Sequence, residues 1–262
     1  MEQPTIRFDD GAAYEDFMGQ WSRRVGEVFL DWLAPGPGLR WADVGCGNGA
    51  FSEMLLDRTA PIDVHGIDPS DAQLAFSRTR LAGQPARFTQ GNAMALPLAD
   101  ASVDAAVMAL VIFFVPEPAR GVAEMARVVV PGGSVSAYSW DLTGGGFPYA
   151  ALREELAAIG VTMAWPPQPE ASRVDVMHSL WAAAGLVDLQ TREISVERSY
   201  ADFDTFWRAA QKGPNVAPQV GGLSAADVGT LTDRLRARFP PDAQGRVTLT
   251  ARAGAIKGRR AG

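Results

Sequence analysis

Hydrophobic and polar positions follow two periods that alternate through residues 39–140. Short apolar segments near residues 41–44, 64–67, 86–90, 103–109 and 134–140 predict strands. Between them, apolar side chains return every three or four positions, which predicts helices. Strands that alternate with helices predict an α/β fold with a doubly wound, Rossmann-like, mostly parallel sheet. A ligand site is then expected above the carboxyl ends of the strands.

The segments on either side of this core predict a cap and a set of insertions. Residues 13–33 carry apolar side chains at helical spacing, and the Pro-Gly repeat at 35–38 ends that helix. Beyond residue 141, helical patterns flank a long strand at 186–197, and the terminal segment 246–256 alternates like an edge strand. We therefore expect a single domain (1–262) with an N-terminal helical cap (1–38), a cofactor-binding core (39–140) and a remainder (141–262) of lid insertions and C-terminal strands, which include an antiparallel edge strand.

The most informative segment is DVGCGNG at residues 43–49, which follows the first predicted strand. Its glycines leave backbone N–H groups uncovered by side chains, so a ligand can lie directly against the chain. The helix predicted from residue 51 points its N-terminus at the same place. The pattern therefore indicates a cradle for a cofactor.

The cradle alone leaves the cofactor open. Gly45, Gly47 and Ala50 also satisfy a dinucleotide-binding fingerprint, and Asp68 lies at the spacing of a ribose-binding acid. Asp43, however, would oppose the negative charge of a pyrophosphate. A carboxylate at this position suits a cationic ligand, or a loop whose N–H groups it holds.

Composition excludes several classes of protein. The 262 residues carry a formal net charge of −6, which argues against broad contact with nucleic-acid phosphates. A single cysteine, Cys46, rules out an intrachain disulfide and a cysteine-based metal site, and two histidines are too few for a histidine cluster. No leader pattern and no apolar run of membrane-spanning length is present. We expect a cytoplasmic protein with no metal and no membrane or nucleic-acid partner, its oligomeric state open.

Further segments extend the cradle into an ordered set of motifs: residues 43–49, 66–70 (GIDPS), 90–98 (QGNAMALPL), 103–104 (VD) and 127–133 (RVVVPGG). Together they resemble class I S-adenosylmethionine-dependent methyltransferases of the small-molecule type. The resemblance spans roughly residues 39–140 and implies S-adenosyl-L-methionine as cofactor and a small-molecule methyl acceptor. A nicotinamide-dependent oxidoreductase and a non-catalytic S-adenosylmethionine-binding protein are the alternatives.

The resemblance also implies roles for the matched residues. Asp68 would accept the ribose hydroxyls, and Asn92, where many relatives carry aspartate, would contact the adenine edge. Trp21 would approach the sulfonium through a cation–π contact, although an aromatic stripe at helical spacing is also typical of a protein core. The expected cofactor-binding set is Asp43, Gly45, Cys46, Gly47, Asp68, Pro69, Asn92, Ala93, Met94, Ala109, Leu110 and Trp21.

The expected substrate side departs from the family pattern. Phe113 and Phe114 stand where many relatives carry a histidine pair that faces the substrate. Phenylalanines exchange no protons, so we expect a dry, hydrophobic wall and an apolar or aromatic acceptor, and we name no catalytic base. Cys46 is interpreted as a packed loop residue rather than a nucleophile. The expected substrate-binding set is Tyr14, Phe113, Phe114 and Trp140.

Overall fold

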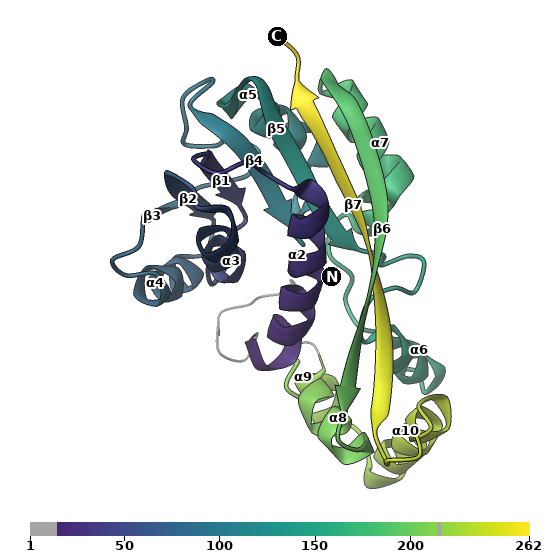
Figure 1. The fold of residues 1–262 in the computed structure, drawn as a ribbon. Helices are drawn as coiled ribbons and strands as arrows, with labels where there is room; N and C mark the ends of the chain where they lie inside the picture. The colour runs from purple at the N-terminus through teal and green to yellow at the C-terminus, as the bar shows by residue number, and fades with distance from the viewer. Residues whose placement is uncertain (1–14, 214–215) are drawn as a thin grey trace.

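The computed structural model describes residues 15–213 and 216–262, and these form one sheet covered by helices on both faces (Figure 1). The sheet has seven strands in the order β3-β2-β1-β4-β5-β7-β6. The first five strands are parallel to one another, whereas β7 is antiparallel to both of its neighbours. The strands are β1 (Arg40–Val44), β2 (Asp63–Asp68), β3 (Ala86–Gln90), β4 (Val103–Ala109), β5 (Val129–Trp140), β6 (Leu186–Tyr200) and β7 (Val247–Arg260).

The helices connect these strands as the alternating pattern predicts. Within the described residues the helical elements are η1 (Glu15–Gly19), α2 (Gln20–Leu33), α3 (Ala50–Thr59), α4 (Asp71–Arg80), η2 (Ile112–Phe114), α5 (Pro118–Val128), α6 (Ala150–Ala158), η3 (Pro169–Ser172), α7 (Val174–Ala183), α8 (Phe203–Ala210), α9 (Ala217–Gly221) and α10 (Ala225–Arg238). The predicted α/β class and mostly parallel sheet are therefore confirmed. None of these helices, over residues 15–213 and 216–262, has the length and apolarity that crossing a bilayer requires.

Strand β4 separates two hydrophobic clusters, because successive side chains of a strand point to opposite faces. Ala105 and Val107 face the cluster that α2 and α3 cover. Ala106 and Met108 face the cluster that α5 and α7 cover. The nearly continuous apolar run that predicted a strand buried on both faces thus lies at the centre of the sheet.

The start of β5 differs from the pattern-based prediction. The Pro-Gly-Gly segment at 131–133 is not a separate turn but an irregularity inside β5, whose pairing with β4 jumps from Val129 to Ser134. A Cβ on Gly133 would lie 2.5 Å from the carbonyl oxygen of Asp104, so this strand passes too close to its neighbour for a larger residue. A proline and two glycines are typical of a turn, and sequence alone does not distinguish a turn from a bulge.

The terminal strand also occupies a different position from the one its alternation suggested. Strand β7 lies between β5 and β6, and β6 forms the edge. Only residues 253–259 of β7 pair with β5, whereas residues 247–252 pair with β6 alone. Buried and exposed side chains alternate over residues 247–251, because this part of β7 belongs to a two-stranded ribbon that has one buried face. Figure 1 shows this ribbon extending to α8 and α10.

We predict that Trp181→Phe destabilises the fold by about 2–3 kcal/mol, through lost volume and a lost hydrogen bond. Trp181 lies on α7, is completely buried, and its indole N–H donates to the carbonyl oxygen of Val135 on β5 at 3.0 Å. Urea denaturation measures the change. The matched control is Trp165→Phe, because Trp165 is 44% exposed and should tolerate the change with little loss. Equal unfolding midpoints for the two variants would contradict this prediction.

Candidate functional site

The glycine loop bends sharply against β2 at the end of β1. The N–H groups of Gly45 and Cys46 both donate to the carbonyl oxygen of Ile67, at 2.7 and 3.1 Å. Gly45 has a φ of +79°, and a Cβ there would lie 2.5 Å from a methyl carbon of Val111. Both the backbone conformation and the close approach therefore require glycine.

The carboxylate of Asp68 fastens this loop to the end of β2. One oxygen accepts from the N–H of Gly47 at 2.9 Å, and the other accepts from the N–H of Ser70 at 2.9 Å. Asp68 is 9% exposed, and burial raises its pKa. Each carboxylate oxygen has lone pairs beyond the one that the backbone N–H uses, so both remain able to accept from a ligand hydroxyl.

Asp43 is the second carboxylate beside the loop, and it is fully buried. The hydroxyl of Ser52 donates to Oδ2 at 2.6 Å, whereas Oδ1 has no hydrogen-bond partner in the described part of the chain. Burial raises the pKa of Asp43 to about 7, against the lowering effect of the Ser52 hydrogen bond. Among the described contacts, Asp68 rather than Asp43 accepts a hydrogen bond from a loop N–H. Asp68 therefore has the loop-holding role that the sequence also allowed for Asp43.

These groups line a cavity of about 920 Å³ at the carboxyl ends of the strands. The cavity extends from the glycine loop across Asp68 to the loop after β3, and residues of η1, α2 and the 165–167 segment close it. Ten residues of the expected cofactor-binding set line it: Asp43, Gly45, Cys46, Gly47, Asp68, Pro69, Asn92, Ala93, Ala109 and Leu110.

Other expected residues lie away from this cavity. Trp21 has no exposed surface and packs in the cluster under α2, which is the core position its spacing also allowed. Met94 packs against the opposite cluster. Neither residue lines the cavity, because both side chains pack against the hydrophobic core. Tyr14 lies outside the described residues. In place of Trp21, the N-terminal helix contributes Ser22 and Arg23 to the wall.

The side chain of Asn92 has a structural role besides its position at the cavity. Its Oδ1 accepts from the N–H of Met94 at 2.9 Å, which closes a tight turn after β3. The turn interpretation and the ligand interpretation are compatible, since an amide oxygen has two lone pairs.

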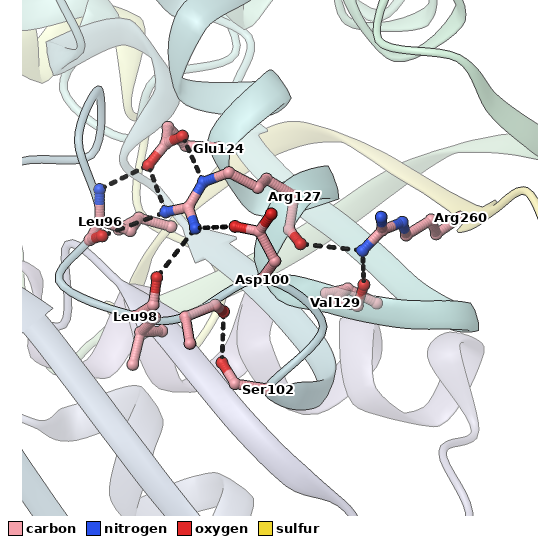
Figure 2. Close-up of polar contacts among 9 residues, drawn as sticks. Leu96, Leu98, Asp100, Ser102, Glu124, Arg127, Val129 and Arg260 are labelled. Atoms are coloured by element: carbon pink, nitrogen blue, oxygen red, sulfur yellow. Dashed lines mark hydrogen bonds and ion pairs between the residues drawn. The ribbon is translucent and has the colours of Figure 1, made fainter.

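The loop that carries Asn92 and Ala93 is fixed by one arginine on α5 (Figure 2). Arg127 donates to both carboxylate oxygens of Glu124, to Asp100, and to the carbonyl oxygens of Leu96 and Leu98, so all five of its N–H groups are used. Glu124 also accepts from the N–H of Leu96 at 2.7 Å. Hydrogen bonding to Glu124 and Asp100 raises the pKa of Arg127. This network holds the loop that forms one wall of the cavity, although its own side chains do not line the cavity. No sequence motif indicated it.

A second cavity, of about 680 Å³, adjoins the first. The two share four lining residues: Leu110, Phe114, Trp165 and Pro166. Phe113 and Trp140, both expected on the substrate side, line the second cavity, and further aromatic rings come from Phe17, Phe147 and Tyr149. The expected phenylalanine wall therefore lies at the boundary between the two cavities.

Segments distant in sequence close this boundary. The backbone N–H of Gln168 donates to the carbonyl oxygen of Phe113 at 3.0 Å, and its side-chain amide donates to the carbonyl oxygen of Pro116 at 2.9 Å. These bonds join the loop after β4 to the proline-rich segment at 166–169. That proline-rich composition indicated a loop, but no local pattern indicated where it would dock.

Beyond the two carboxylates of the first cavity, neither Cys46 nor a histidine offers acid–base chemistry there. Burial raises the pKa of the Cys46 thiol well above its usual range, so the sulfur stays protonated and is a poor nucleophile. His65 lies on β2, bonded to Thr89 and Arg87, and lines neither cavity. Across residues 15–213 and 216–262, no group of three or more histidine, cysteine or acidic side chains could hold a metal ion.

The strand order, the glycine loop after β1 and the acid at the end of β2 form a Rossmann-like fold with a crevice for a cofactor. Comparison with known proteins agrees: residues 42–137 match the methyltransferase domain family. This match to part of the chain supports the resemblance to class I S-adenosylmethionine-dependent methyltransferases.

Curated relatives cover only part of the chain. A demethylmenaquinone methyltransferase of Renibacterium salmoninarum is 37% identical over 140 residues, which is 51% of this chain and 57% of the relative. An uncharacterized methyltransferase of Mycobacterium bovis is 38% identical over 104 residues, 40% of this chain and 41% of the relative. The chain thus spans about half the length of these relatives.

A solved structure extends the likeness to nearly the whole fold. Phosphoethanolamine N-methyltransferase 2 of Haemonchus contortus, in complex with S-adenosyl-L-methionine, superposes with a TM-score of 0.60 at 15% identity. The alignment covers 97% of this chain and 58% of that one. At this identity the likeness shows the fold alone.

We predict that Asp43→Asn changes the pH dependence of stability. The folded protein holds a proton on Asp43 up to about pH 7, whereas the unfolded chain loses it near the ordinary pKa of 3.8. This group therefore makes the ligand-free protein less stable as pH rises from about 4 to 7. An asparagine side chain does not titrate, so the variant should have the higher Tm at pH 8, by on the order of 5 °C.

Scanning calorimetry from pH 5 to pH 8 without ligand measures this effect. The control is Asp57→Asn, a change at an exposed position of α3 that should leave the slope as it is in the natural protein. If the Tm values of Asp43→Asn and of the natural protein change in parallel with pH, burial does not raise the pKa of Asp43, and the prediction is wrong.

We predict that Arg127→Lys loosens the loop at residues 91–98, because an ammonium cannot replace five directed N–H donors. Amide hydrogen exchange at Leu96 should become about tenfold faster or more. The matched control on the same helix is Arg120→Lys, which keeps the positive charge near Glu124 and whose described contacts are a 3.8 Å surface ion pair with Glu117 and no hydrogen bond to the loop. Unchanged protection at Leu96 would show that the loop does not depend on Arg127.

Proposed function

We propose that the protein transfers a methyl group from S-adenosylmethionine to a small-molecule acceptor. The observation that supports this most directly is the pairing of two buried carboxylates, Asp43 and Asp68, with the glycine loop in one cavity. Within the described residues, Asp43 has one oxygen without a partner, which suits the amino group of the methionine part. The pyrophosphate of a nicotinamide dinucleotide would lie against negative charge, so the oxidoreductase alternative fits less well.

In this proposal, different residues bind the methionine part, the ribose and the adenine of the cofactor. The loop N–H groups and Asp43 would hold the methionine part, Asp68 the ribose hydroxyls, and Asn92 with Ala93 the adenine. Arg23 would face the cofactor carboxylate from the N-terminal helix. When bound, the cofactor supplies an electrophilic methyl carbon, and the protein aligns the nucleophile with the carbon–sulfur bond and excludes water.

The second cavity is the proposed acceptor site. Phe113, Phe114 and Trp140 give it apolar walls, and it meets the cofactor cavity at Leu110 and Phe114. A relative named demethylmenaquinone methyltransferase favours an aromatic acceptor here as well. The adjoining cavity favours catalysis over cofactor binding alone, because a binding protein does not need a second chamber beside the methyl group.

The parts of the chain would contribute separately. Residues 39–140 would bind the cofactor, residues 1–38 would cap it, and residues 141–262 would enclose the acceptor. We propose a cytoplasmic location, where the buried Cys46 thiol would remain reduced.

We predict that S-adenosylhomocysteine binds and that Asp68→Asn weakens its binding about 30-fold, because charge-assisted hydrogen bonds to the ribose are lost. Isothermal titration calorimetry measures both affinities. The matched control is Asp71→Asn, at the first residue of α4 and exposed, which should leave the affinity unchanged.

The same titration with NADH separates the alternatives. Tight NADH binding without S-adenosylhomocysteine binding would overturn the proposal. A panel of phenols, hydroquinones and carboxylic acids, assayed with methyl-labelled S-adenosylmethionine, tests transfer itself. Tight cofactor binding with no labelled product across the panel would instead favour the non-catalytic alternative.

A further inference from the structure

The second cavity contains a guanidinium that no carboxylate of the described residues neutralises. Arg153 lies on α6, half-buried, and lines this cavity. Its Nη1 donates to the carbonyl oxygen of Ala164 at 3.0 Å, and its Nη2 donates to that of Met163. Burial lowers the pKa of Arg153, and no charged neighbour among the described residues contributes to that shift. The positive charge is therefore balanced only by carbonyl dipoles in this part of the chain.

The acidic residues of the same cavity are already paired elsewhere. Glu154 lies 2.6 Å from Arg238, and Glu170 lies 3.7 Å from Arg173. Because each carboxylate faces its own arginine, Arg153 is the charge in the lining of this cavity that has no ion-pair partner among the described residues. Such a cavity repels an ammonium group and attracts an anion.

The guanidinium also has free donors and a fixed orientation. Its Cζ lies 3.7 Å from the ring centroid of Trp165, so the aromatic ring holds the planar group in place. A guanidinium has five N–H groups, and two of them donate to the carbonyl oxygens named above. The remaining donors can bind a carboxylate or an ionised phenol, which a neutral cavity would bind poorly.

Trp165 connects this group to the cofactor cavity. Its ring lines both cavities, whereas Arg153 lines only the second. An anion on Arg153 would thus lie on the acceptor side of the shared wall, with the aromatic rings of Phe113, Phe114 and Trp140 around the rest of the molecule.

We identify no general base among the described residues of this cavity, because Glu154 and Glu170 already face arginines. Burial raises the pKa of Tyr149, whose hydroxyl donates to the carbonyl oxygen of Phe17 at 3.1 Å. An acceptor that is already ionised at neutral pH needs no base.

We infer that the acceptor is a planar, apolar molecule that carries an acidic group, a carboxylate or an ionised phenol, and that Arg153 binds that group. This inference rests on the proposed function, since it assigns the second cavity to the acceptor. It makes Arg153 a specificity-determining residue and excludes cationic amines as preferred acceptors.

The test uses three probes of equal ring size at pH 7: 2-naphthoate, 2-naphthol and 2-naphthylmethylammonium. Their binding is measured by calorimetry and by quenching of tryptophan fluorescence, with and without saturating S-adenosylhomocysteine. We expect naphthoate to bind about tenfold or more tightly than naphthol, with the ammonium weakest, on the scale of a hydrogen bond to a charged group. Because this comparison uses the natural chain, no folding defect can obscure it.

Variants then assign the preference to one residue. Arg153→Gln should bring naphthoate to the affinity of naphthol and leave naphthol within about threefold, while Arg153→Lys should keep part of the preference. The control Arg192→Gln removes an exposed arginine of β6 that lines neither cavity, and should change nothing. Calorimetric melting of each variant verifies folding.

The outcomes separate the two proposals. If S-adenosylhomocysteine does not bind, the proposed function fails, and the probes without it still test the cavity. If it binds but naphthol or the ammonium binds as well as naphthoate, this inference alone is overturned. An equal loss of all three probes in Arg153→Gln would also overturn it, because Arg153 would then serve only to anchor the 163–165 segment.

Discussion

The carboxylate of Asp68 is the contact on which the first cavity depends. It accepts one N–H from the glycine loop after β1 and another from the residue that caps α4, so two crossover connections meet at one side chain. The hydroxyl of Ser77 on α4 adds a 2.6 Å hydrogen bond to the carbonyl oxygen of Gly47. Because these contacts fix both the N–H and the carbonyl group of Gly47, the loop N–H groups keep a fixed direction before any ligand arrives.

The parallel half of the sheet supplies this arrangement by topology. Strands β1 and β4 are adjacent although they are distant in sequence, and the chain order reverses between them. Ligand sites of doubly wound sheets lie at such a reversal, because the loops diverge there and leave a crevice. Arg127 on α5 then supports the loop after β3, which forms one wall of the crevice. Its hydrogen bonds to the carbonyl oxygens of Leu96 and Leu98 hold this short loop in place.

Sequence predicts the parts of this molecule whose causes are local. The glycine loop and the Ser70 cap of α4 depend on neighbouring residues, so the structure contains both, and ten expected residues line the first cavity. The bulge in β5 and the inner position of β7 depend on which strand lies alongside, which no local pattern contains. Helical spacing predicted that Trp21 is buried, but it could not distinguish a position in the core from one in the cavity wall. The second cavity forms beside the tertiary contact between Gln168 and Phe113, so the sequence did not indicate the role that we propose for Arg153.

The two cavities differ in the ionisable side chains that lack a full set of partners among the described residues: acids beside the glycine loop and an arginine in the second cavity. Asp43 and Asp68 are acids kept beside a loop that a sulfonium ligand would occupy in the proposed function. Arg153 is a charge that no described carboxylate pairs, on the other side of the shared wall. In water such charges would be screened within about 10 Å, but low-dielectric walls of phenylalanine and tryptophan preserve the contrast. In the proposed function, a cation would therefore be favoured in the first cavity and an anion in the second, and the residues that line each cavity would also select which ligand it binds.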